Sequence, residues 1–208
     1  MHPQLIPLSK QLHPFLPLGT EIQVAEMIIT NNVHLKLTKH RATKLGDYRP
    51  PFQGKGHRIT VNKSLNPFSF LITFVHEVAH LTCWNKHQNK AAPHGKEWKA
   101  DFKHLMKPFL AKHVFPENIL TALHKYMQNP AASSCADVDL LKALQYHQPD
   151  DGLLNLEELP ENKDFVLDGN KFFRKGPLER KRFRCLNLTN KRYYFVNALA
   201  RVKPMEDH

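Results

Sequence analysis

The chain has 208 residues, of which 41% are hydrophobic, so it is long enough for one ordinary domain and a small additional module. Its three cysteines are scattered and form no CxxC pair, which argues against a disulfide framework and for a reducing compartment. The net charge is +11, no apolar run reaches about 20 residues, and residues 1–19 lack the apolar core of a signal peptide, so we expect a soluble, cytoplasmic protein outside the membrane.

Hydrophobic spacing along the first half of the chain predicts a mixed α+β domain. Residues 21–31 are expected to form a helix with Ile22, Ala25 and Ile29 on one face. Residues 33–37 alternate between apolar and polar side chains, as in a strand with one buried face. The other expected elements are a loop over 50–54, a strand around Ile59 and Val61, a buried helix with Asn66 as cap and Pro67 at its first position, and helices over 117–128 and 136–147.

The most informative segment is 76–80, with the sequence HEVAH, inside the expected buried helix. Residues four apart share a helix face, so His76 and His80 can bind one Zn²⁺ together. Glu77 would then take a proton from a water molecule beside the metal, as in zinc peptidases. Unpaired polar groups in a buried helix cost several kcal/mol, and a metal supplies the missing partner. A histidine pair satisfied by ordinary hydrogen bonds is the alternative.

A catalytic zinc site usually has three protein ligands and one open position. His94 is the preferred third ligand, because Pro93 and Gly95 frame a turn from which an amphipathic helix starts. The start of that helix disfavours imidazolium, which helps to keep the His94 ring neutral. His87 and Glu97 are the competing candidates, and a His94 that only caps the helix is the alternative without a metal.

The sign of the charge reverses along the chain, and the reversals predict domain boundaries. Residues 1–149 hold 18 basic and 9 acidic side chains, a net charge of +9. Residues 150–168 hold one basic and seven acidic side chains, a net charge of −6. Residues 171–203 hold eleven basic side chains and one acidic side chain, a net charge of +10. We therefore expect a catalytic domain over 1–149, an acidic linker and first strand over 150–170, and a basic β module over 171–208.

The basic module is expected to be a small antiparallel sheet of four or five strands, because turn signals at 168–169 and 189–190 separate aromatic-rich runs. Basic side chains alternate with aromatic ones, and a positive groove with stacking platforms suits single-stranded nucleic acid. An ordinary module with its aromatic side chains inside fits equally well. The predicted nucleic-acid contacts are Arg174, Lys175, Arg180, Lys181, Arg182, Arg184, Lys191, Arg192 and Tyr193.

These motifs resemble the SprT-like domain of bacterial SprT proteins and of the eukaryotic DNA–protein crosslink protease Spartan. The matching segments are LGDYR at 45–49, RITVN at 58–62, Leu65-Asn66, Val75 to Leu81, and His94-Gly95 with Trp98, within about residues 20–112. The resemblance implies zinc ligands at His76, His80 and His94, a catalytic base at Glu77, and a zincin-like α+β domain with the HExxH motif on a buried helix. Many members also carry a zinc ribbon with paired cysteines, which this chain cannot form.

The resulting expectation is a zinc metalloendopeptidase for proteins bound on or crosslinked to DNA. Its basic module would tether it to nucleic acid and so to the nucleoid. The main alternative is a nucleic-acid-binding protein with a structural or vestigial zinc site, and a metal-dependent hydrolase of other substrates is a third. The strand at 58–62 is a candidate edge for an extended substrate, with a core strand as its alternative, and Tyr48 is a candidate to assist at the oxyanion.

Overall fold

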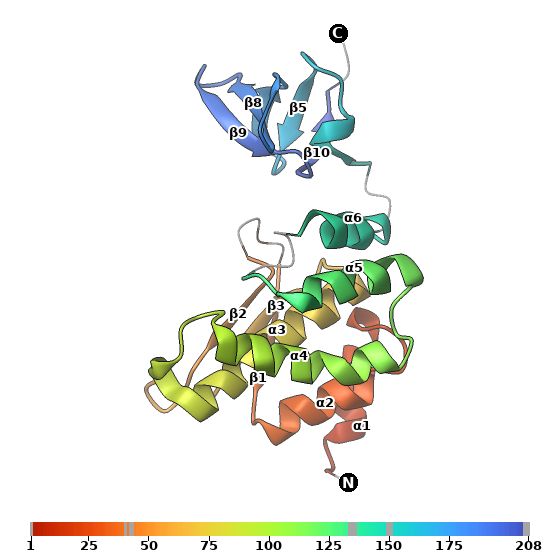
Figure 1. Ribbon diagram of the computed structural model, residues 1–208, viewed down its shortest axis with the longest axis vertical. Helices are drawn as coiled ribbons and strands as arrows, with labels where there is room; N and C mark the ends of the chain where they lie inside the picture. The colour runs from red at the N-terminus through yellow and green to blue at the C-terminus, as the bar shows by residue number, and fades with distance from the viewer. Residues whose placement is uncertain (1, 40, 42–43, 133–136, 149–151, 206–208) are drawn as a thin grey trace. The chain divides into compact units, whose positions relative to one another are not determined.

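The computed structural model describes residues 2–39, 41, 44–132, 137–148 and 152–205, and the chain divides into two compact units, residues 1–148 and 149–208. Each unit has its own hydrophobic core. The described residues form six α-helices and two sheets, which confirms the α+β class (Figure 1). Among these residues, none of the helices combines the length and apolar character that a membrane span requires.

The first unit contains the six helices and a sheet of three strands. Its helices are α1 (Leu5–Leu12), α2 (Glu21–Thr30), α3 (Pro67–His87), α4 (Lys96–Ala111), α5 (Glu117–Gln128) and α6 (Val138–Tyr146), and its strands are β1 (His34–Thr38), β2 (Gly46–Arg49) and β3 (Arg58–Asn62). The predicted helix over 117–128 is confirmed with its bounds. The predicted helix over 136–147 corresponds to α6, although Ala136 lies outside the described residues.

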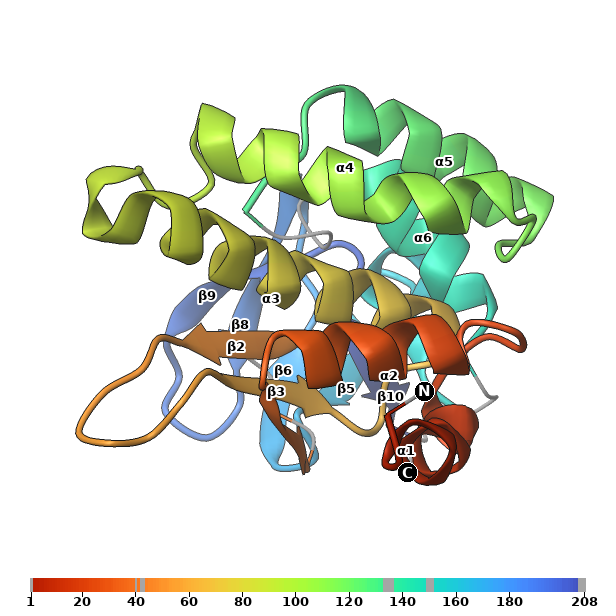
Figure 2. The same ribbon diagram turned by 90° about the horizontal axis from the view of Figure 1, so that it is seen from below.

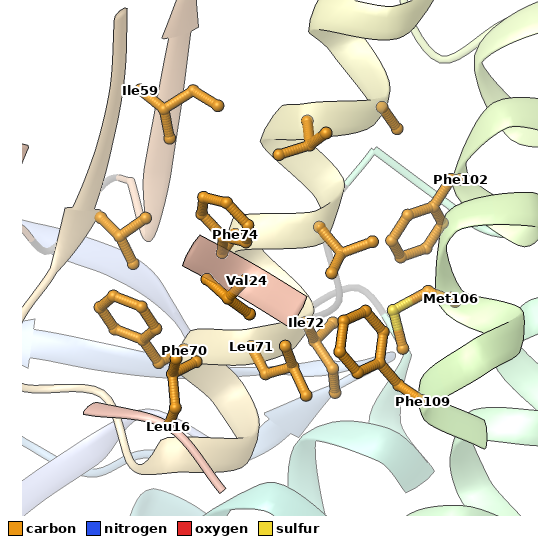
Figure 3. Close-up of a cluster of buried hydrophobic side chains, with 14 of the residues drawn as sticks. Leu16, Val24, Ile59, Phe70, Leu71, Ile72, Phe74, Phe102, Met106 and Phe109 are labelled. Atoms are coloured by element: carbon orange, nitrogen blue, oxygen red, sulfur yellow. The ribbon is translucent and has the colours of Figure 1, made fainter. Parts of the chain in front are cut away.

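Helix α3 is the centre of the first unit and carries the HExxH segment. It begins at Pro67 because the side-chain oxygen of Asn66 accepts a hydrogen bond from the backbone N–H of Ser69 at 2.8 Å. The sheet lies on one side of α3 and α4 on the other (Figure 2). The side chains that fill these two interfaces are Phe70, Phe74 and Ile59 toward the sheet, and Ile72, Phe102, Met106 and Phe109 toward α4 (Figure 3).

The strand order of the first sheet is β1-β3-β2, with β1 parallel and β2 antiparallel to β3. The strand at 58–62 is therefore central and has a partner on both sides, so the expectation that it offers an edge to a substrate is wrong. The edge strand beside α3 is β2. Ile59 and Val61 of β3 are fully buried on the face toward α3, and Arg58 and Thr60 alternate onto the opposite face.

One expectation for the first 31 residues needs correction, and one helix in this segment was not expected. Helix α2 buries Val24, Ala25 and Ile28, whereas Ile22 is 50% exposed. The buried face of the helix is therefore rotated by about one residue from the predicted apolar face. Helix α1 was not predicted, since the prolines of this segment obscure the apolar face that Leu5 and Leu12 bury.

The second unit is a sheet of seven short strands rather than the four or five expected. The order is β4-β10-β5-β6-β8-β7, and β9 pairs with the other edge of β8. Strands β4 and β5 fall in the segment expected to be an acidic linker and first strand. The strands are β4 (Leu154–Asn155), β5 (Asp164–Leu167), β6 (Lys171–Arg174), β7 (Leu178–Glu179), β8 (Arg182–Asn187), β9 (Tyr193–Asn197) and β10 (Arg201–Pro204).

Candidate metal centre

Three imidazole rings converge on one point in the first unit. His76 and His80 lie one turn apart on α3, and His94 approaches them from the turn before α4. The Nε2 atoms are 3.2 Å apart for His76 and His94, 3.3 Å for His76 and His80, and 2.9 Å for His80 and His94. Tetrahedral zinc with Zn–N bonds of about 2.0–2.1 Å places its nitrogen ligands about 3.3 Å apart. The three nitrogens therefore have the spacing of three corners of a zinc tetrahedron.

The surroundings of the three rings keep them neutral. Burial, followed by the neighbouring His80 and His94, lowers the pKa of His76 to about 3, and burial followed by His94 lowers the pKa of His80 to about 4. Burial also lowers the pKa of His94. Neutral imidazoles have a free nitrogen lone pair, and three such nitrogens in mutual contact cannot all satisfy one another. A cation at their centre satisfies all three, so the donor set fits zinc.

Trp98 of α4 forms the wall behind the three rings. It is fully buried, and its ring centroid lies 4.5 Å from that of His76, 5.3 Å from His80 and 4.7 Å from His94. Phe102 stacks on the indole at a centroid distance of 5.1 Å and also lies 5.7 Å from the ring of His76. Packing of this kind restricts the rotamers of the imidazoles and so preorganises the donor set.

The turn that presents His94 is strained. His94 lies two residues before α4, not in its first turn, and its φ of 56° is in the left-handed region, which costs about 1 kcal/mol or more for a residue with a Cβ. The turn closes through a hydrogen bond of 2.9 Å from the backbone N–H of Gly95 to the carbonyl of Ala92. A Cβ at position 95 would lie 2.9 Å from that same carbonyl oxygen. The turn that presents His94 therefore requires a glycine at position 95.

Glu77 is held beside the imidazoles by the edge strand β2. It is only 7% exposed, and burial, followed by the charge of Asp47, raises its pKa to about 8, while the backbone N–H of Tyr48 donates a hydrogen bond that opposes the rise. A Cβ at Gly46 would lie 2.7 Å from Glu77 Oε1 and 2.7 Å from Thr73 Cγ2. The sequence reasoning missed this role of β2. The signal for it was the glycine at position 46.

Tyr48 closes the site on the side of β2. Its ring lies parallel to that of His80 at a centroid distance of 6.5 Å, and its hydroxyl oxygen is 3.0 Å from Nδ1 of His57. Burial raises the pKa of Tyr48, so the phenol stays protonated at neutral pH.

The competing third ligands lie outside the group of imidazoles. Among the described residues, His76, His80 and His94 form the one cluster of three or more His, Cys, Asp and Glu side chains close enough to hold a metal ion. His87 ends α3, and Glu97 has its carboxylate 3.8 Å from the ammonium of Lys96. Cys83 and Cys185 are free, and Cys135 lies outside the described residues.

The basic side chains expected to contact nucleic acid lie in different surroundings in the second unit. Lys175 is 4% exposed, its ammonium donates to the carbonyls of Glu157 and Leu159, and it lies 4.0 Å from the ring centroid of Phe183, so it is not available to a ligand. Residues 180–182 lie in the β7–β8 turn and at the start of β8, whereas residues 191–192 lie in the turn at its other end.

The two remaining arginines of that set are engaged with acids. Arg174 donates two hydrogen bonds to Asp164, at 2.7 and 3.0 Å. Arg184 bonds Glu179 at 3.4 Å and stacks its guanidinium over Tyr193 at 4.4 Å from the ring centroid. Tyr193 itself is 59% exposed.

Comparison with known proteins agrees with the geometry of the first unit. Residues 21–119 match the family model described as the SprT-like family. No curated protein and no solved structure matches the chain. The matched residues include the sheet, α3 with its two histidines and Glu77, and the turn with His94. Residues 21–119 therefore form a SprT-like domain.

Proposed function

We propose that this protein is a zinc-dependent endopeptidase. The observation that carries the proposal is the convergence of the Nε2 atoms of His76, His80 and His94 at 2.9–3.3 Å, beside a buried glutamate. Membership of the SprT-like family, which is associated with zinc and metallopeptidase activity, supports it.

In this proposal, bound Zn²⁺ supplies Lewis-acid polarisation of the scissile carbonyl and of the attacking water. Glu77 accepts a proton from that water and returns it to the leaving amine. Its pKa of about 8 in the metal-free protein lies near neutrality, where a carboxylate can both accept and release a proton. The hydrogen bond from the backbone N–H of Tyr48 fixes the carboxylate in place for both transfers.

An extended peptide would bind along the free edge of β2, the strand that adjoins Glu77. Backbone pairing of this type gives affinity with little preference for side chains. It therefore suits an enzyme that cleaves many different proteins. We propose that these substrates are proteins bound on or crosslinked to DNA, and that the basic module at residues 171–208 tethers the enzyme there.

One observation favours a second candidate function, a nucleic-acid-binding protein whose zinc site is structural. In the second unit, Tyr193 and Phe195 are 59% and 56% exposed on the same face of β9, and Arg184 stacks on Tyr193. An exposed aromatic ring beside an arginine is a stacking platform for an unpaired base.

The two candidates are separated by a cleavage assay on a protein substrate with and without single-stranded DNA. Glu77→Gln is the catalytic control, because it keeps the shape of the side chain and cannot accept the proton. We expect wild-type protein to cleave and the variant to retain zinc without cleaving. Cleavage by the zinc-loaded variant would show that Glu77 is not the catalytic base. DNA binding without any cleavage by zinc-loaded wild-type protein would favour the second candidate.

A further inference from the structure

The face of the first sheet that points away from α3 carries a basic groove. A cavity of about 650 Å³ lies over this face, on the side chains that alternate away from the buried Ile59 and Val61. Among the described residues, the groove has no acidic lining residue. Its ionisable lining residues are His34 and Lys36 of β1, Arg49 of β2, Arg58 of β3, and Lys55 of the β2–β3 loop.

The sheet register brings three of these side chains into one row. Arg58 is paired with His34 of β1 on one side and with Arg49 of β2 on the other. Side chains directly opposite each other have their Cβ atoms about 4.5–5.5 Å apart, and like charges in this arrangement are destabilising. The opposed arginines therefore cost stability to the extent that no anion offsets their charges.

Acidic side chains of the described residues balance the charges on this face only in part. Asp47 of β2 is shared between Arg49 at 2.9 Å and Lys44 at 2.8 Å, so one carboxylate pairs with two cations. The Nε atom of Arg58 is buried and has no hydrogen-bond partner among the described residues. Arg41 adds a further cation, because its guanidinium bonds the side chains of Thr60 and Asn62 on the same face.

An aromatic side chain lies at the tip of the loop that borders the groove. The β2–β3 loop is closed by a β-bridge between Phe52 and Lys55, and Phe52 is 65% exposed. Cationic side chains that can follow a phosphate backbone, beside an exposed aromatic ring, are the combination that single-stranded nucleic acids require.

We propose that this groove binds the phosphate backbone of a single-stranded nucleic acid, with Phe52 as a stacking platform for a base. The site lies on the opposite face of the sheet from α3, and all of its lining residues belong to the first unit. It does not depend on the proposed peptidase activity, because no residue of the metal centre contributes to it. Occupation of the groove would leave β2 and Glu77 open to a protein substrate.

The test is the salt dependence of binding to a fluorescently labelled oligothymidylate by the full chain. The test variant is Lys36→Gln/Arg58→Gln, and the matched control is Lys10→Gln/Lys107→Gln, which removes the same charge from exposed positions on α1 and α4. For single strands the magnitude of the slope of log affinity against log salt is about 0.7 per phosphate contact. The test variant removes two cations, so the magnitude of its slope should be smaller than that of wild type by about 1.4. The control should keep the wild-type slope.

Two further variants keep the test decisive. Lys36→Gln/Lys55→Gln replaces the test variant if loss of Arg58 lowers the melting temperature, and it should lose the same slope. Lys181→Gln/Arg182→Gln removes two charges from the second unit. An unchanged slope in the groove variants, or an equal loss in the Lys10/Lys107 control, would overturn the proposal. So would a loss confined to the Lys181/Arg182 variant.

Discussion

The backbone N–H of Tyr48 donates a hydrogen bond to the carboxylate of Glu77, which joins the edge strand of the sheet to the metal-binding helix. The strand can approach this closely because position 46, on the same strand, has no side chain. The proposed base is therefore positioned by an element far from it in the sequence. A change in β2 should disturb the base without disturbing the imidazoles.

Gly46→Ala should separate catalysis from metal binding. The added Cβ would lie 2.7 Å from Glu77 Oε1 and from Thr73 Cγ2, so the carboxylate must move. A displacement of about 1 Å can cost about 100-fold in rate, so we expect a loss of that order in cleavage at normal zinc content. Gly56→Ala is the control, since its Cβ would meet only the carbonyl of Asn32, at 3.8 Å. Equal activity of the two variants would contradict this role of Gly46.

The pH dependence of stability should report the buried carboxylate in the zinc-free protein. Burial raises the pKa of Glu77 from its ordinary 4.5 to about 8, so its contribution to stability is complete below pH 4.5 and is lost as the pH rises to about 8. Glu77→Gln cannot ionise and should avoid this loss. In urea unfolding, the free energy of unfolding of the variant relative to wild type should therefore rise by about a few kcal/mol between pH 4.5 and 8. Parallel curves for the two proteins would contradict the raised pKa.

Gly95→Ala should weaken zinc binding through the turn that presents His94. Its Cβ would lie 2.9 Å from the carbonyl oxygen of Ala92, which is the acceptor that closes the turn. Disturbing the support of a metal ligand typically costs 10- to 100-fold in affinity, so we expect a loss of about that size in competition with a chelator. Lys96→Ala is the neighbouring control, because its side chain is 92% exposed. A wild-type affinity in Gly95→Ala would show that the turn does not position the ring.

Lys175→Ala should lower the stability of the second unit and leave nucleic-acid binding unchanged. The variant leaves the carbonyls of Glu157 and Leu159 without their buried donor, at a cost of roughly 1–3 kcal/mol. Lys171→Ala is the control, since that side chain is 54% exposed and pairs with Asp168 at 2.8 Å. Thermal unfolding and the salt slope of DNA binding measure the two effects. A smaller salt slope for Lys175→Ala alone would show that Lys175 contacts the nucleic acid.

Local patterns predicted the elements that local forces specify. Helix α3 begins at Pro67 behind the Asn66 cap as expected, because a cap and a first-turn proline act within a few residues. The spacing of His76 and His80 on one helix face is local in the same sense. The composition of strand β2 does not predict a strand, since the four residues GDYR show no apolar alternation and pair with β3 through tertiary contacts.

Contacts between distant segments account for what the sequence left open. The hydrogen bond between Tyr48 and Glu77 depends on how β2 docks against α3, which no spacing rule encodes. The burial of Lys175 could have been predicted from the alternation of side chains along a strand. Phe173 and Lys175 lie on the same, buried side, and Arg174 between them points outward. The basic groove needed the β1-β3-β2 order, which sets His34, Arg58 and Arg49 side by side.

The central claim is that three imidazoles hold one zinc ion, and elemental analysis of purified protein tests it most directly. Wild-type protein and Glu77→Gln should each contain one zinc per chain, whereas His94→Ala, which removes one corner of the 2.9–3.3 Å triangle of nitrogens, should lose most of it. Metal-free wild-type protein after purification in the presence of zinc, or a full zinc content in His94→Ala, would contradict the account.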